Sequence, residues 1–395
     1  MASIATPAFA DALVASSSNT AIRDTASRVQ TGSSNGLSYT AASRIIGVTP
    51  TGNAPSPALV GGGDPRYFAN RPAHNGVVAL IMQTSAGAFI CSGSLMADRR
   101  SILTAAHCVS DGAGTANPIS TTAYFYGGND PDHRLPFNPG STAVSVTDYF
   151  VNAGYTGEVV DHNDIAVLRL ADLAPSFATA YELATAADLT GALFNVAGVG
   201  GRSTIGGDFG ANARTGYLRQ GLNNYDFALG NSDFQGFFTD RDANGRNFFG
   251  FAEIEHSLIS DFDNGRAAND GSCRVTAALG LGPMPQFCDL GRGADEVSVA
   301  GGDSGGPQFV NGRISSVTSY GLSFGTTFGD IRAGLNSSFG EMNGFVPTSI
   351  HRNFILSSLV APIPEPASWA LMIIGFGFVG SAIRRRHAKV NVSFA

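Results

Sequence analysis

The stretch Gly302-Asp303-Ser304-Gly305-Gly306-Pro307 tells most about the fold and chemistry of this chain. Glycines on both sides leave few side chains around Ser304, and they allow a tight turn that presents its hydroxyl group. The same turn can aim the backbone N–H groups of Gly302 and Ser304 at one point, as an oxyanion hole requires. An ordinary glycine loop is the alternative, since the chain contains 50 glycines. A serine hydroxyl is a weak nucleophile without a base, so a histidine and an acid are needed.

Two further stretches supply a histidine and an acid. Leu103-Thr104-Ala105-Ala106-His107-Cys108 ends an apolar run with a histidine, and Asp161-His162-Asn163-Asp164 precedes an apolar strand at 165–168. We prefer Asp164 to Asp161 because it stands directly before the strand, where a buried carboxylate can fix the imidazole tautomer. His162 is expected to be a solvated neighbour rather than a second base.

The order His, Asp, Ser in these contexts resembles the trypsin/chymotrypsin-like serine peptidase family over about residues 59–360. The resemblance implies His107 as general base and acid, Asp164 as its orienting group, Ser304 as nucleophile, and Gly302 and Ser304 as the oxyanion hole. It also implies an all-β, chymotrypsin-like fold of two six-stranded antiparallel Greek-key β-barrels. We expect the first barrel at about 59–180, the second at about 190–345, and a C-terminal helix within 345–359. Short apolar strands at 77–82, 88–96 and 101–105 agree with a barrel.

The resemblance further implies a substrate-binding edge at Ser319, Tyr320 and Gly321, where a substrate backbone pairs as an antiparallel strand. Ser298, six residues before Ser304, matches the base of the primary specificity pocket. A serine there, in place of an acid, predicts cleavage after apolar or small residues. Gly321 and Gly344 are expected to leave this pocket open.

Four cysteines suit an exported protein with two disulfides, and the sequence alone allows three pairings. The resemblance favours Cys91 with Cys108, which leaves Cys273 with Cys288. The family's frequent cysteine before the nucleophile turn is absent, because Ala300 and Gly301 occupy that approach. The substrate pocket must therefore be held without that disulfide.

Composition limits the possible partners. The formal net charge of −7 argues against nucleic acid. Two loops, 240–245 and 261–265, resemble cation-binding loops, but Phe251 stands where an EF-hand needs its bidentate acid. We interpret both loops as plain Asp/Asn/Gly turns, and we expect no metal and no cofactor.

The N-terminal residues indicate export. Ala8-Phe9-Ala10 fits a signal-peptide cleavage site, so we interpret residues 1–10 as a signal-peptide remnant whose start lies upstream; a disordered N-terminus is the alternative. Residues 11–58 are rich in small polar residues and are expected to form a flexible pro-segment or linker. Cleavage before Ile45 or before Leu59 could create the new N-terminus that this family inserts, and both remain open.

The C-terminal segment, 361–395, is a separate signal. Pro364-Glu365-Pro366 precedes an apolar run at 367–383 that contains Trp369, and Arg384, Arg385 and Arg386 follow the run. These parts in order resemble a PEP-CTERM sorting signal, the substrate of an exosortase-type enzyme in Gram-negative bacteria. The resemblance implies a short membrane-sorting helix, transient anchoring in the inner membrane, and then the cell surface or extracellular matrix. A plain transmembrane tail anchor is the alternative.

Together these features predict an exported serine endopeptidase that hydrolyses protein or peptide substrates through an acyl-enzyme. Two alternatives stay open: a catalytically silent binding or matrix protein on the same fold, and an esterase with the same triad.

Overall fold

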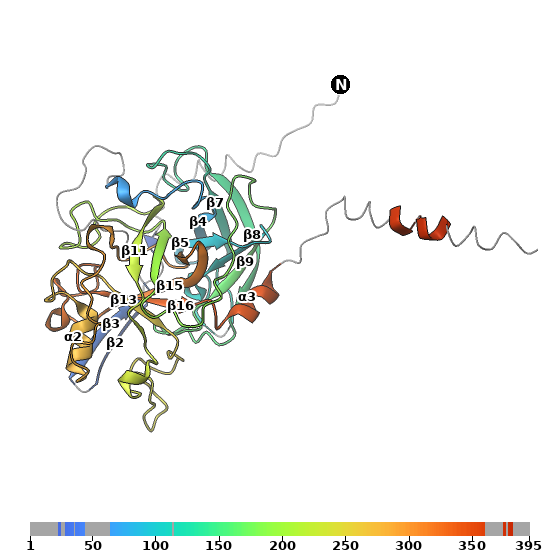
Figure 1. The fold of residues 1–395 in the computed structure, drawn as a ribbon. Coiled ribbons are helices and arrows are strands. Elements are labelled where there is room, and N and C mark those ends of the chain that lie inside the picture. Colours follow the sequence, from blue (N-terminus) through green and yellow to red (C-terminus); the bar gives the residue numbers. More distant parts are fainter. Residues whose placement is uncertain are drawn as a thin grey trace, which may run out of the picture. The chain divides into compact units, whose positions relative to one another are not determined.

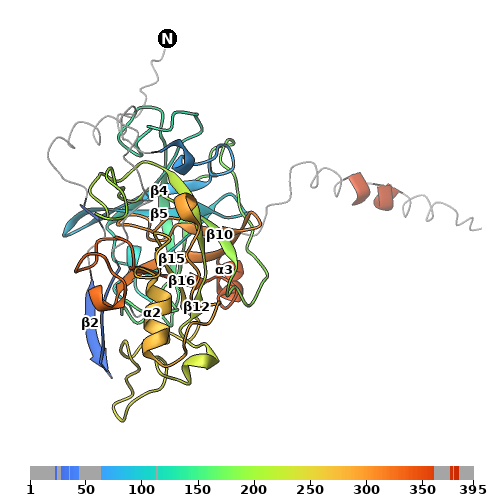
Figure 2. The same ribbon diagram turned by 60° about the vertical axis from the view of Figure 1, so that its left-hand side comes forward.

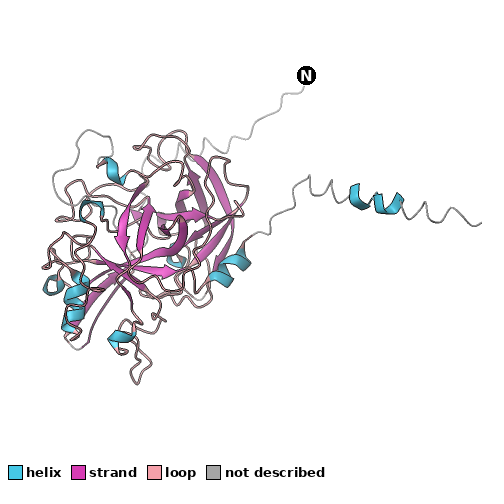
Figure 3. Cartoon of the chain, viewed as in Figure 1, coloured by secondary structure: helices cyan, strands magenta, loops and turns pink. Residues whose placement is uncertain are grey.

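The computed structural model describes residues 23–24, 28–34, 36–43, 64–112, 114–359, 374–376 and 378–381. The chain divides into a body, Met1–Leu359, and a tail, Val360–Ala395. The body is mostly β-structure with a few short helices (Figure 3). Ala8, Ile45, Leu59 and the predicted sorting residues Pro364, Glu365, Pro366, Trp369, Arg384, Arg385 and Arg386 lie outside the described residues.

The first half of the body is a closed barrel of six antiparallel strands (Figure 1). Its spatial order is β5-β4-β7-β8-β9-β6, and β6 pairs with β5 to close it. The strands are β4 (Val77–Thr84), β5 (Gly87–Leu95), β6 (Ser101–Thr104), β7 (Ser120–Phe125), β8 (Thr142–Val151) and β9 (Ala166–Leu170). A two-residue strand, β1 (Arg23–Asp24), adds to β5 in parallel. The barrel forms because runs such as Val77–Met82 bury apolar side chains. The predicted six-stranded first barrel is confirmed.

The second half is a sheet that curves without closing. Its order is β11-β10-β14-β15-β16-β13-β12, and among the described residues no pairing joins β12 back to β11. The strands are β10 (Leu193–Gly198), β11 (Arg219–Asn224), β12 (Phe227–Ala228), β13 (Leu258–Asp261), β14 (Pro307–Val310), β15 (Arg313–Ser323) and β16 (Met342–Pro347). The structure thus has a half-barrel where we predicted a second closed barrel. β12 has only two residues, which is too short to provide a closing ladder.

Residues expected to be flexible form a β-hairpin on this sheet. β2 (Val29–Ser34) pairs with β3 (Leu37–Ala42), and β3 pairs with β15. Leu37, Tyr39 and Ala41 alternate inward and are buried, while the outer strand β2 is mostly exposed. Figures 1 and 2 both place this blue hairpin at the same end of the body as α2 (Gly271–Ala278). Alternating apolar side chains on an otherwise polar segment explain why it docks as a strand.

The helices are short. Besides α2 there is α3 (Arg352–Ser358), within the region where the C-terminal helix was expected. Single 3₁₀ turns are η1 (Pro65–Tyr67), η2 (Ala106–Cys108), η3 (Ser232–Phe234), η4 (Gly293–Asp295) and η5 (Thr326–Phe328). Both predicted disulfides are present, Cys91–Cys108 and Cys273–Cys288.

The long region 202–290 contributes several phenylalanines to an aromatic cluster in the interior. The hairpin packs on this cluster, and the ring of Tyr39 lies 4.6 Å from that of Phe249. The buried rings that this region adds to the cluster are Phe227, Phe234, Phe238, Phe249 and Phe287.

In the tail, residues 374–376 and 378–381 are helical. Among the described residues, no helix combines the length and apolar character needed to cross a membrane.

Candidate active site

His107 and Asp164 meet at the edge of the first barrel. His107 sits on η2 just after β6, and Asp164 comes two residues before β9. Asp164 Oδ1 accepts the backbone N–H of His107 at 2.7 Å, and Oδ2 accepts the Nδ1–H at 2.7 Å. Both side chains are almost fully buried, at 3% and 2% exposure. These bonds place the imidazole proton on Nδ1 and leave Nε2 free to accept a proton.

The rival acid, Asp161, faces a different part of the chain. Its Oδ2 accepts hydrogen bonds from the backbone N–H and hydroxyl of Thr156, and its Oδ1 accepts one from the backbone N–H of Asn163. Burial raises the pKa of Asp161 to about 6. Asp161 therefore ties its own loop together and makes none of the bonds to His107. His162 was expected to be solvated, yet its side chain is only 8% exposed, because it packs beside His256 and His351.

Ser304 lies in a turn held against the strands that carry His107. The Ser304 carbonyl oxygen accepts the backbone N–H of Ser92 on β5 at 2.8 Å. Gly305 has a φ of +80°, and a side chain there would collide with Thr104 Oγ1, three residues before His107. Glycine is required at this position both for the backbone angle and for the close approach.

Four polar groups of this turn and of His107 have no partner. Within the described part of the chain, Ser304 Oγ and His107 Nε2 are buried and make no hydrogen bond. The backbone N–H groups of Gly302 and Ser304 also donate to no acceptor there. Buried polar groups are normally paired, so these four groups form a set ready for an incoming molecule.

Asp303 anchors the turn from the side of the second sheet. Its Oδ1 accepts the N–H of Gly200 at 2.7 Å, and its Oδ2 accepts the N–H of Ala300 at 2.8 Å. A side chain at Gly198 or Gly200 would collide with this carboxylate. The glycines of β10 and the loop after it thus make room for Asp303.

The structure gives the predicted substrate-binding residues contacts that differ from those expected. Ser319 Oγ donates to Asp164 Oδ2 at 2.5 Å, so this side chain supports the acid, a role that sequence reasoning missed. Ser298 is buried and donates to Asn343 Oδ1 at 3.0 Å. Gly344 was expected to keep the pocket open, but the fully buried ring of Tyr320 packs against it and takes the space that a side chain would fill.

The strand edge expected to bind substrate is already paired in part. Gly321 stands opposite Ala42, Leu322 opposite Ala41, and Ser323 opposite Thr40, all antiparallel. β3 therefore takes the direction and position that an added substrate strand would take at Gly321.

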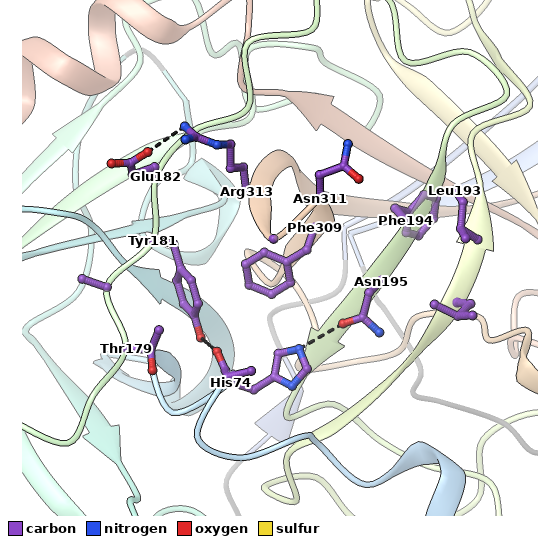
Figure 4. A pocket seen from close by; sticks show the side chains of 14 residues that line it. His74, Thr179, Tyr181, Glu182, Leu193, Phe194, Asn195, Phe309, Asn311 and Arg313 are labelled. Atoms are coloured by element: carbon purple, nitrogen blue, oxygen red, sulfur yellow. Dashed lines mark hydrogen bonds and ion pairs between the residues drawn. The ribbon is translucent and has the colours of Figure 1, made fainter.

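A cavity of about 730 Å³ lies away from His107, Asp164 and Ser304. It is lined by residues such as His74, Tyr181 and Asn195 and by none of the predicted site residues (Figure 4). There, His74 Nε2 lies 3.0 Å from Asn195 Oδ1, and Arg313 pairs with Glu182 at 2.6 Å (Figure 4). A smaller cavity of about 200 Å³ adjoins His107 and Cys108.

Comparison with known proteins agrees with both predicted resemblances. The family model described as Trypsin matches residues 65–220, which include His107 and Asp164 and stop before Ser304. A second model, described as PEP-CTERM protein-sorting motif, matches residues 362–386. No curated protein matches the chain. Residues 65–220 thus match the trypsin family model, and residues 362–386 match the PEP-CTERM protein-sorting motif.

Proposed function

We propose that this chain is an exported serine endopeptidase that uses His107, Asp164 and Ser304. The trypsin-family match supports a peptidase, and the sorting motif supports export. One observation carries the proposal: Asp164 binds His107 through two hydrogen bonds, while His107 Nε2 and Ser304 Oγ are buried and make no hydrogen bond to any described residue. Nucleophilic catalysis needs a base fixed in one tautomer and a hydroxyl group that is free to give up its proton.

In the proposed reaction, Ser304 Oγ attacks the peptide carbonyl carbon while His107 Nε2 takes its proton. The negative oxygen of the tetrahedral intermediate binds the N–H groups of Gly302 and Ser304. His107 then gives the proton to the leaving amine, and an acyl-enzyme remains. Water, deprotonated by His107, releases the acid product. Asp164 stays ionised throughout and stabilises the imidazolium.

The described form has features of a precursor. Ser304 is fully buried, and β3 occupies the β15 edge at Gly321. A polypeptide substrate needs access to both. We therefore propose that the hairpin 28–43 belongs to a pro-segment that leaves the β15 edge before substrate binds.

The proposed cleavage preference rests on Ser298, whose hydroxyl donates to the neutral amide oxygen of Asn343. The function therefore includes cleavage after apolar or small residues. A peptide library read by mass spectrometry tests this preference, and selection for Arg or Lys before the cut would contradict it.

A fluorophosphonate probe tests the catalytic assignment. We expect covalent labelling of Ser304 after limited proteolysis, weak labelling before it, and none in Ser304→Ala. Ser304→Ala should keep the circular dichroism spectrum of the parent protein, because the side chain makes no hydrogen bond. Labelling retained in folded Ser304→Ala would contradict the proposal.

The same experiment separates the alternatives. A silent binding protein would stay unlabelled after proteolysis, whereas a triad esterase would be labelled but would leave peptide substrates intact.

The proposed site of action is outside the cell. The sorting motif supports recognition by an exosortase-type enzyme at the inner membrane, followed by release or transfer to the cell surface.

A further inference from the structure

A group of buried carboxylates gathers at the end of β13, separate from His107, Asp164 and Ser304. Asp261 ends β13, Asp263 follows two residues later, and Asp270 caps the N-terminus of α2. One carboxylate oxygen from each lies within 4.8 Å of the others. The three residues are 5%, 1% and 2% exposed.

Two more buried acids support this group. Asp226 Oδ2 accepts the backbone N–H of Asp261 at 2.8 Å, and Glu296 Oε1 accepts that of Asp263 at 2.6 Å. Within the described residues none of these five carboxylates forms an ion pair. This part of the interior therefore holds five buried acids, and no basic side chain of the described residues pairs with them.

Asp263 stands out within the group. Asp261 Oδ2 accepts the N–H of Ser272 at 2.8 Å, and Asp270 Oδ1 accepts the N–H of Cys273 at 2.7 Å. By contrast, Asp263 Oδ1 is buried and accepts no hydrogen bond from any described residue. Burying a carboxylate oxygen without a partner is unfavourable, and a bound cation is one group that would compensate the cost.

We propose that Asp261, Asp263 and Asp270 bind a divalent cation of the calcium type. Hard cations take carboxylate oxygens, and calcium–oxygen distances of about 2.3–2.6 Å put two ligand oxygens at most about 5 Å apart. The observed separations fit that limit. The nearby sulfur atoms of Cys273 and Cys288 are joined in a disulfide, so the site offers oxygen ligands rather than thiolates.

This assignment replaces the interpretation of 261–265 as a plain turn. The residue that completes the set, Asp270, lies on the following helix cap. The other candidate loop, 240–245, keeps the plain-turn interpretation. Its Asp242 is exposed and accepts the N–H groups of Asn244 and Arg246 within its own loop.

The cation site connects to the proposed substrate pocket. Asn223 Nδ2 donates to the carbonyl oxygen of Asp261 at 2.7 Å and to that of Val297 at 3.1 Å. Val297 directly precedes Ser298, and Glu296 directly precedes Val297. A bound cation would stabilise the segment 296–298. The chain lacks the disulfide that often holds this pocket in the family, because it has no cysteine just before the nucleophile turn.

The test uses the full chain with Ser304→Ala, so that neither self-cleavage nor activity affects the result. After EDTA treatment and dialysis, we expect equilibrium dialysis to find one calcium ion per chain. Saturation at about 100 times Kd should raise Tm by about 5 °C. Magnesium should give a smaller rise, because it prefers octahedral sites with several waters.

Asp263→Asn is the decisive variant, and Asp242→Asn is its matched control. Asp263→Asn should abolish the calcium-induced rise while its Tm in EDTA equals or exceeds that of the parent, because one of the repelling charges is gone. Asp242→Asn should keep the full rise. No calcium bound by the parent, or unchanged calcium affinity in Asp263→Asn, would overturn the proposal.

Discussion

At the residue scale, Asp164 gathers hydrogen bonds from three donors on two segments. The backbone N–H and Nδ1–H of His107 come from the first barrel, and the Ser319 hydroxyl comes from β15. One carboxylate thus fixes the base and joins the two halves of the body. This arrangement supports Asp164, two residues before β9, over Asp161 as the proposed catalytic acid.

Asp164→Asn should therefore disable the enzyme without unfolding it. The amide group cannot accept both His107 bonds and stabilise an imidazolium, so the wrong tautomer is favoured and kcat falls by a factor on the order of 10⁴. Steady-state kinetics on a peptide substrate, after activation, measure the effect. Asp161→Asn is the control and should change kcat only slightly. The reverse pattern would assign the catalytic acid to Asp161.

A second prediction concerns His351, which is held neutral. Its Nε2–H donates to the His162 carbonyl oxygen at 2.7 Å, and its Nδ1 accepts from Asn152 at 2.9 Å. Burial chiefly, and then repulsion from His162 and His256, lower the pKa of His351 to about 4. Protonation thus favours the unfolded chain, and stability is lost as pH falls from about 6.5 toward 4.

His351→Gln should remove this contribution. Between pH 7 and pH 5, the parent should lose about 2 kcal/mol more unfolding free energy than the variant. Urea unfolding at both pH values measures the difference. His74, whose pKa burial also lowers, contributes equally to both proteins and cancels, whereas His162 is coupled to His351 and the measured difference reports the pair. If the two proteins lost equal amounts of unfolding free energy between pH 7 and pH 5, His351 would not titrate in this range.

At the scale of elements, the hairpin β2–β3 covers the edge of β15 at which the proposed substrate would bind. Arg28 anchors its start, donating to the Gly157 carbonyl oxygen at 2.7 Å and pairing with Asp111. Tyr39 anchors its inner strand, with its hydroxyl 3.2 Å from the Phe249 carbonyl oxygen. The start and the inner strand of the hairpin are both held, so β3 competes directly with any strand that adds to Gly321.

Tyr39→Ala should weaken this competition. Losing the ring removes apolar burial and the hydroxyl contact, so the hairpin should leave β15 more often and probe labelling of Ser304 should rise several-fold without proteolysis. Ser33→Ala, on exposed β2, is the control and should leave labelling unchanged. A chain starting at Asp64 should label most strongly. If both Tyr39→Ala and this shortened chain label no faster than the parent, the hairpin does not block the site.

At the scale of the whole molecule, the two family-model matches fall in different units of the chain. The body carries the trypsin-family match, and the sorting motif lies entirely in the tail. Residues 367–395 hold Arg384, Arg385, Arg386 and Lys389 and no acid, so removing them would change the net charge from −7 to −7 − 4 = −11. Processing of the tail would therefore release a more acidic protein.

The mature protein should consequently end before Trp369. Mass spectrometry of the protein from the surface and matrix fractions of its host identifies the C-terminus. Replacing Pro364, Glu365 and Pro366 by alanine should block processing and retain the chain in the membrane fraction. A native chain that still ends at Ala395 in the inner membrane would favour the plain tail anchor instead.

Some features of this protein are local in the sequence and could be predicted from it. The glycine turn around Ser304, the apolar run before His107 and the acid before β9 each depend on neighbours within a few residues. The short apolar strands of the first barrel are local as well, whereas the six-stranded barrel and the pairing of Cys91 with Cys108 were expected from the family resemblance. The half-barrel could not be predicted, because closure depends on how seven strands drawn from residues 193–347 curve together and place the two edge strands, β11 and β12.

Tertiary structure alone decided the rest. Leu37, Tyr39 and Ala41 alternate as a strand requires, but their docking on β15 depends on an aromatic surface about 200 residues away in the sequence. Tyr320 fills the space at Gly344, and Asp270 joins Asp261 and Asp263, through burial that no local pattern encodes. Burial and hydrogen-bond partners are set by contacts between distant segments, and these contacts determine which polar groups are left to bind a ligand.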